Sequence, residues 1–286
     1  MATINSISAA HESSLAEKKA MLRSVVLLLS STLLLSSCSH IFYSNAMPHT
    51  PLLKKKGDLQ LAAGISAGEA GKSYDHSQLE FQGAYAINDK IGIIASYQRI
   101  YSTAKTLSEK TLFNSCGTAG IGYFSTIGKT PVIYEIYAGG GMGEVHNFFE
   151  HEWGSYSKLN VLQKDRYYKG FLQGNIGVKH KDFEIGLSSR FTYLSYYELE
   201  QYQTEGATAG VQFPYYREYD DKVYQNESYF FEPGIRMNLG RKVHYFVSAS
   251  ASFPLSRYNI DNYQMFNFAT GLNFFINTRE LKKKKE

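Results

Sequence analysis

The sequence predicts an all-β protein that folds as an up-and-down antiparallel β-barrel of about ten strands. Apolar and polar residues alternate with a period of two over most of the chain beyond residue 57. Short and long connections between these segments follow each other in turn. The composition agrees, because aromatic residues make up 15% of the chain and there are only 6 prolines, and strands favour aromatic side chains and exclude proline.

The alternation is clearest in residues 182–194, 228–239, 243–253 and 266–277. In the first of these segments, Phe183, Ile185 and Leu187 share one face, and Glu184 and Arg190 lie on the other. We expect strands at residues 58–67, 76–88, 91–102, 113–126, 131–144, 166–180, 182–196, 227–239, 242–253 and 264–277.

The connections indicate a membrane-spanning barrel. Tight links follow the second, fourth, sixth and eighth strands, and the links after the odd-numbered strands are longer, above all residues 145–165 and 197–226. Outer-membrane barrels have short periplasmic turns and longer extracellular loops. Spanning strands must also close on themselves, because lipid offers no partner for backbone N–H and C=O groups. We therefore expect a transmembrane barrel at residues 58–277, a basic tail at 278–286, and both chain ends on the periplasmic side.

The N-terminus has the features of a cleaved leader. Lys18, Lys19 and Arg23 precede the apolar run Val25–Leu35, and small residues and Cys38 follow. A helix of that run spans ~16 Å, about half of a bilayer core, so we favour a signal peptide over a transmembrane helix. We assign residues 1–37 to the signal peptide, with Met21 as an alternative start, and residues 38–57 to a linker.

Charge and cysteine content exclude several classes of function. The net charge is only +4, and no nucleic-acid-binding motif is present. Cys38 and Cys116 are the two cysteines, so no disulfide framework is predicted. The glycine run Gly139–Gly143 lacks the spacing of a phosphate-binding loop, and we interpret it as strand. We predict no cofactor and no metal site.

Charged residues gather on the polar face of the strands and form a candidate interior network. Buried charges need partners, so the network could serve as a selectivity path, as a proton relay or as a rigid salt-bridge plug, and we favour the plug. Its members are Glu80, Glu135, Lys169, Glu184, Arg190, Glu232 and Arg236.

Aromatic residues that stand beside acidic ones in two of the long connections are candidates for recognition. They are Trp153, Tyr215, Tyr216 and Tyr219. Such residues suit contact with a sugar or a protein, and they equally suit an aromatic girdle at the membrane surface. The histidines and glutamates of residues 146–153 do not have the spacing of a helical zinc site.

Three short stretches carry a family resemblance. Leu35-Ser36-Ser37-Cys38 resembles the lipobox of bacterial lipoproteins, which implies cleavage before Cys38 and acylation of its thiol and amino groups. Residues 45–48 together with residues 51–58 resemble the segment that precedes the barrel in outer-membrane proteins of Bacteroidetes-like bacteria. Residues 271–276 resemble the signal that the barrel assembly machinery recognises, which implies that partner.

The expected function is non-enzymatic: an outer-membrane barrel lipoprotein with a structural role or loop-mediated contacts to an extracellular ligand, and with a narrow or plugged pore. The alternative is a periplasmic, lipid-anchored barrel of lipocalin type, whose apolar faces would point inward around a small hydrophobic ligand. A lipid hydrolase is a third interpretation. The mature chain has no His-x-Ser pairing, although His244, Ser248 and Ser250 share the polar face of one strand.

Overall fold

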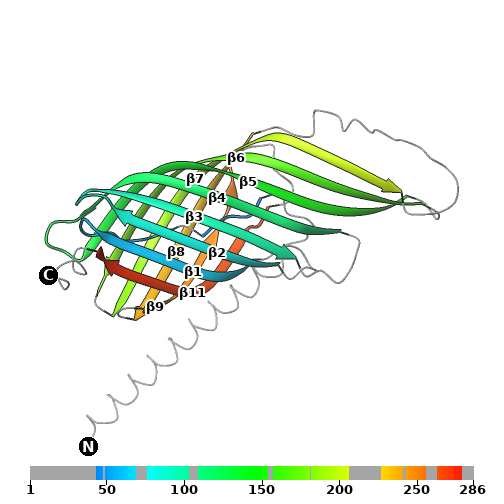
Figure 1. The fold of residues 1–286 in the computed structure, drawn as a ribbon. Coiled ribbons are helices and arrows are strands. Elements are labelled where there is room, and N and C mark those ends of the chain that lie inside the picture. Colours follow the sequence, from blue (N-terminus) through cyan, green and yellow to red (C-terminus); the bar gives the residue numbers. More distant parts are fainter. Residues whose placement is uncertain are drawn as a thin grey trace, which may run out of the picture. The chain divides into compact units, whose positions relative to one another are not determined.

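The computed structural model describes residues 43–47, 49–68, 76–102, 109–153, 157–180, 182–205, 227–240, 243–255 and 263–278. These residues form ten long strands and one short piece (Figure 1). The long strands are β1 (Asp58–Gly68), β2 (His76–Ala86), β3 (Ile91–Ser102), β4 (Glu109–Thr126), β5 (Val132–Trp153), β6 (Ser157–Lys179), β7 (Phe183–Glu205), β8 (Glu227–Gly240), β9 (Val243–Ala251) and β11 (Phe266–Asn277). The two-residue strand β10 (Phe253–Pro254) pairs with β8. No helix within the described residues is long and apolar enough to cross a membrane.

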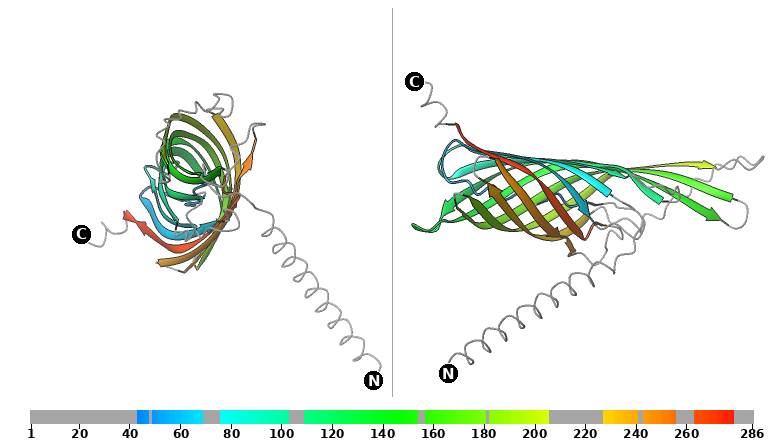
Figure 2. Two further views of the ribbon diagram at one scale, coloured as in Figure 1. Left: turned by 90° about the vertical axis from the view of Figure 1, so that its right-hand side faces the viewer. Right: turned by 90° about the horizontal axis from the view of Figure 1, so that it is seen from below.

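The sheet closes into a barrel, as the sequence predicts (Figure 2). Each strand pairs with its neighbour in an antiparallel sense, and β1 pairs with β11 from Asp58↔Asn277 to Gly68↔Asn267. Closure gives the edges of the first and last strands a hydrogen-bonded partner, which is the condition for a sheet to stand in lipid. The predicted fold class, an all-β antiparallel barrel, is confirmed.

Three strands extend far beyond the ends that the alternation predicts. The sequence pattern predicts loops at residues 145–165 and 197–226, but β5 continues to Trp153, β6 begins at Ser157 and β7 continues to Glu205. The reason is cross-strand pairing: the register of β5 and β6 runs without a break from Val132↔Val178 to Trp153↔Ser157. Strands β5, β6 and β7 therefore project beyond their neighbours at the end of the barrel that carries the long connections (Figure 2).

The apolar face of the strands points outward. Ile65, Met142 and Leu172 are 62%, 61% and 52% exposed. The polar residues that alternate with them are buried inside, among them Gln82 and Gln173. A ligand-binding barrel of the lipocalin type needs the opposite arrangement, so that alternative is wrong for this chain. An apolar outer surface around a polar interior is the arrangement of a barrel in a bilayer.

Aromatic pairs lie on the outer face toward both ends of the strands. Tyr168 and Tyr197 stack with ring centroids 4.4 Å apart, toward the long connections. Tyr123 and Tyr134 lie 6.1 Å apart near the short turns. Beyond the first pair, the outer face becomes charged: Arg166 forms ion pairs with Glu144 (3.0 Å) and Glu198. Aromatic girdles at both edges of an apolar band are typical of transmembrane barrels.

The glycine run of β5 makes room for aromatic rings inside the barrel. A Cβ at Gly139 would lie 2.7 Å from the ring of Phe171, and one at Gly143 would lie still closer to the ring of Tyr167. The run is therefore strand and has a packing role, as the sequence predicts.

Candidate functional site in the barrel lumen

Residues 43–57 of the same chain, which we call the interior segment, pass through the lumen, with residues 54–56 exposed at its end; all but residue 48 are described. Tyr43, Met47, Leu52 and Leu53 are at most 1% exposed. The sequence predicts a linker at residues 38–57, and the structure buries its described residues from 43 to 53 inside the barrel. Within its described residues the segment forms one sheet bridge, from Tyr43 to Tyr263. Side chains of the barrel wall make most of its other hydrogen bonds, as described next.

Amide side chains of the wall bind the backbone of the segment. Gln98 donates to the carbonyl oxygen of Ser44 (2.9 Å), and Gln82 donates to that of Met47 (3.0 Å). The carbonyl oxygen of His49 accepts two such bonds, from Gln173 at 2.6 Å and Asn175 at 3.0 Å. Buried peptide groups need partners of this kind, so the inner face is matched to the polar groups of an extended chain.

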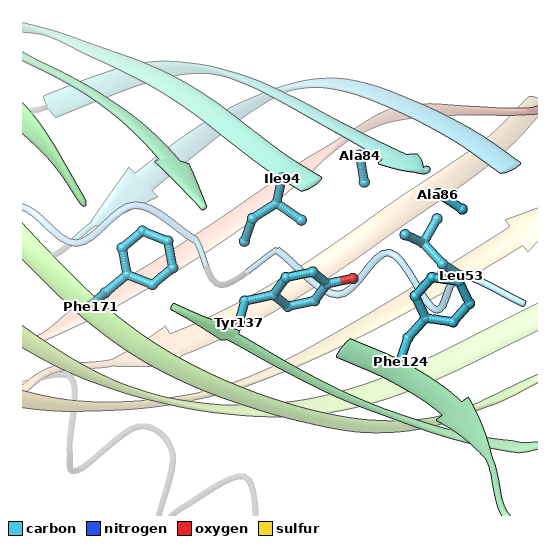
Figure 3. Packing of buried hydrophobic residues seen from close by; sticks show 7 residues of the cluster. All are labelled: Leu53, Ala84, Ala86, Ile94, Phe124, Tyr137 and Phe171. Atoms are coloured by element: carbon cyan, nitrogen blue, oxygen red, sulfur yellow. The ribbon is translucent and has the colours of Figure 1, made fainter. Parts of the chain in front are cut away.

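Three apolar clusters inside the barrel each contain one residue of the segment. Tyr43 packs with Phe230 and Leu194, and Met47 packs with Phe246. Leu53 belongs to a third cluster, and Figure 3 shows it beside Ala86 and Phe124. The other members of that cluster are Ala84, Ile94, Tyr137 and Phe171. Wall and segment therefore share one core.

The segment ends in a tight junction with β1. Leu52 has a positive φ of 49°, an uncommon conformation for a residue other than glycine, and both Leu52 and Leu53 are fully buried. The backbone N–H groups of Lys54 and Lys55 donate to the carboxylate of Asp58, at 2.9 and 3.1 Å. These bonds fix the turn through which the segment enters β1. The neighbouring residue 56 is bound as well, because its N–H donates to a carboxylate in the β2–β3 turn at 2.8 Å.

All seven charged residues proposed for the interior are buried on the inner face, at 3% exposure or less. Four of them bind the interior segment directly, and one of these is Glu232, which accepts from the hydroxyl of Tyr43. Glu135 accepts from the N–H of Leu53 at 2.8 Å, and Glu80 from that of Met47 at 3.4 Å. Lys169 donates to the hydroxyl of Tyr43 at 2.8 Å.

Glu232 and the remaining three charged residues bond mainly to uncharged side chains. Glu232 accepts from Tyr43, Thr192 and Ser252, and Glu184 accepts from Asn238. Arg190 donates to Gln173, and Arg236 donates to Gln82 and Asn238. Glu184 also forms an ion pair with Lys179 (2.9 Å), a residue that the sequence does not single out.

The hypothesis of a salt-bridge plug therefore needs correction. Among these seven described residues the contacts run through amides, hydroxyls and the segment, and no two of the seven lie within ion-pair distance of each other. Amides satisfy a buried charge through hydrogen bonds without requiring an opposite charge beside it. The plug is a polypeptide segment, and the charges help to hold it.

Several candidates named from the sequence fall beyond the described side chains. Cys38, Tyr215, Tyr216, Tyr219 and the lysine tail lie outside the described residues. Trp153 ends β5, but its side chain is among those not described. No group of three or more metal-ligating side chains occurs within the described residues.

The polar face of β9 is in contact with the segment. Ser250 accepts from the side chain of Asn45 at 3.2 Å, and Ser248 contacts the sulfur of Met47. His244 lies 3.9 Å from Glu184. Both serines considered for a lipid hydrolase therefore face residues of the interior segment.

The sequence does contain a signal for this arrangement, although strand periodicity does not reveal it. Residues 41–53 carry no Asp, Glu, Lys or Arg, unlike an ordinary solvated linker. The inner faces of the strands are also rich in glutamine and asparagine, which can both donate to and accept from a peptide backbone.

Together, the closed sheet, the apolar outer face, the aromatic girdles and the filled polar lumen define an outer-membrane β-barrel. No family model matches the sequence, and no curated protein matches it.

Solved structures with related architecture are similar at low identity. The outer membrane protease OmpT from Escherichia coli is 9% identical, with 78% of this chain and 99% of that chain covered and a TM-score of 0.44. The translocator domain of the autotransporter NalP from Neisseria meningitidis is 12% identical, with 92% and 96% covered and a TM-score of 0.44. An outer membrane channel from Pseudomonas putida F1 is 8% identical, with 81% and 100% covered and a TM-score of 0.40. With scores this low, the fold assignment rests on the strand pairing described above.

Proposed function

We propose that this chain is a non-enzymatic, lipid-anchored barrel of the bacterial outer membrane, plugged by its own interior segment. Its long strands and loops would then be held outside the cell for contact with a partner. The occupied lumen carries this proposal. The fully buried residues Tyr43, Met47 and Leu53 stand where an open pore would need water, and small barrels leave little interior space beyond their side chains.

Three observations support the separate parts of the proposal. The leader that ends in Leu35-Ser36-Ser37-Cys38 supports secretion and acylation at Cys38. The projecting strands β5, β6 and β7 support contact with an extracellular ligand, with Trp153, Tyr215, Tyr216 and Tyr219 as the residues we propose for it. The contacts of Ser248 and Ser250 with the interior segment favour a non-enzymatic role over hydrolysis on this face.

The test combines membrane extraction with conductance. Residues 42–286 are expressed behind an ordinary cleavable signal, without Cys38, and the membranes are washed with carbonate. We expect retention in the outer membrane, faster gel migration before boiling than after, and no stable channel openings in a planar bilayer. Release as a soluble periplasmic protein would rule out the integral barrel, and large sustained openings would rule out the plug.

A cysteine pair tests the plug directly. In a Cys116→Ser background, we expect Met47→Cys and Ser248→Cys to form a disulfide, because the two side chains are in contact. The matched control pairs Met47→Cys with Val247→Cys, since the Val247 side chain is 46% exposed on the outer face. Cross-linking of the control pair and not of the first pair would place the segment elsewhere.

A further inference from the structure

The direction of the interior segment has a consequence for the lipid anchor. Gln264, in the connection between β9 and β11, donates its N–H to the carbonyl oxygen of Tyr43 at 2.9 Å. Asn267, at the start of β11, donates to the carbonyl oxygen of Asn45 at 3.0 Å. The segment therefore begins at the end of the barrel that carries the long connections.

The segment then crosses to the opposite end. His49 pairs with Gln60 (3.1 Å), the third residue of β1. The Nζ of Lys54 donates to the carbonyl oxygen of Lys179 (3.2 Å), where β6 ends before a short turn. With the N–H of residue 56 bound to Asp89 in the β2–β3 turn, the crossing is complete.

We infer that the barrel presents the residues before Tyr43 on its extracellular face, so that the lipid on Cys38 enters the outer leaflet of the outer membrane. The inference rests on the proposed function, in which the barrel is integral and Cys38 is acylated. It replaces the expectation that both chain ends are periplasmic. An even number of strands places the start of β1 and the end of β11 on the same side of the membrane. It does not determine where the N-terminus lies when the chain passes through the lumen before β1.

The short length of chain between Cys38 and Tyr43 determines on which side of the membrane Cys38 lies. Five extended residues reach at most ~18 Å, whereas the crossing in the lumen takes the chain from Tyr43 to Gly57. A return to the short-turn end would need a second passage through a lumen whose wall residues are already buried against the first, among them Gln98, Lys169 and Glu232. The extracellular position follows from the long connections at that end, since these face outward in such barrels.

The experiment places a site for a sequence-specific protease, flanked by glycine and serine residues and an epitope, between Ser39 and His40. Two control proteins carry the same insert, one in the connection of residues 69–75 and one after Glu286. Cells are fed an alkyne fatty acid, treated intact with the protease, and then treated after permeabilisation. Antibody binding to the epitope on intact cells is the second readout.

We expect the insert after Ser39 and the insert in 69–75 to be cut and bound by antibody on intact cells. The barrel should lose its fatty-acid label on cleavage, and the insert after Glu286 should be cut only after permeabilisation. If the insert after Ser39 is cut only in permeabilised cells, or resists cleavage throughout, the inference is overturned.

If the proposed function is wrong, the cleavage, gel-migration and labelling results differ from those that would overturn the inference alone. Without an integral barrel, the insert in 69–75 is not accessible on intact cells and gel migration no longer depends on boiling. Without acylation, the label is missing before any protease is added, as it would be in a Cys38→Ala variant.

Discussion

The hydroxyl of Tyr43 donates a 2.6 Å hydrogen bond to Oε1 of Glu232, across 189 positions of sequence. The same hydroxyl accepts from Lys169 at 2.8 Å, and its ring stacks on Phe230 with centroids 4.7 Å apart. Tyr43 thus lies between the buried side chains of Lys169 and Glu232 and bonds to both. This contact fixes the start of the segment to β6 and β8.

Replacing Tyr43 by phenylalanine should destabilise the barrel while keeping its shape. The variant leaves Lys169 without that acceptor and Glu232 with one donor fewer, so we expect a loss of about 1–3 kcal/mol in the free energy of unfolding. Urea titration in lipid vesicles, followed by gel migration without boiling, measures it. Tyr229→Phe is the matched control, because its hydroxyl binds Glu227 on the outer face at 3.4 Å. Equal losses in both variants would contradict a special role for Tyr43.

A methyl group at Gly177 should disturb the other end of the segment. Its Cβ would lie 2.8 Å from the side chain of Leu52 and 2.6 Å from the carbonyl oxygen of Ile185. We expect Gly177→Ala to cost about 1–3 kcal/mol through overpacking, seen as a lower midpoint in the same titration. Gly117→Ala should be nearly neutral, since no heavy atom lies within 4 Å of its Cβ. An unchanged midpoint for Gly177→Ala would mean that Leu52 can leave its place freely.

The sequence predicts the strands of the barrel wall well because the alternation of their residues depends only on neighbouring positions in the chain. In a closed sheet successive residues face opposite sides in turn, so spacing alone places Phe183, Ile185 and Leu187 on one face. That this face is the outer one is shown by the exposure of Phe183 and Leu187 in the structure. The seven interior charges follow from the same rule. The ends of β5, β6 and β7 do not, because beyond the apolar band the pairing continues where the alternation fades.

The interior segment could not be predicted by that rule. Its position depends on contacts with distant residues, such as Tyr43 with Glu232 and Asn45 with Asn267. Two prolines and the lysines 54–56 give it the composition of a linker. Only the match between the uncharged residues 43–53 and a wall rich in amides distinguishes a plug from a tether, and that match becomes visible once the register of the strands is known.

The free-energy cost of a charged side chain on the outer face should depend on its depth in the bilayer. Leu187 lies between Phe183 and Tyr193 on the outer face of β7 and is 52% exposed there. We expect Leu187→Lys to cost about 2–4 kcal/mol and to lower the yield of folded barrel in the membrane, whereas Ile276→Lys, next to the end of β11, should cost about 0–1 kcal/mol. Unfolding titrations of both variants in the same lipid give the comparison. The opposite order would mean that the apolar band does not face lipid.

Loosening the amides that hold His49 should let water and ions pass. Gln173 and Asn175 both donate to its carbonyl oxygen and so bind the middle of the segment to the wall. We expect the double variant Gln173→Ala, Asn175→Ala to show brief openings in planar bilayers, because the unbound peptide group would recruit water. Asn238→Ala is the control: that amide is also buried, but its contacts are to Glu184 and Arg236. If the control opens as often as the double variant, the openings come from a general loss of interior packing and not from release of the segment.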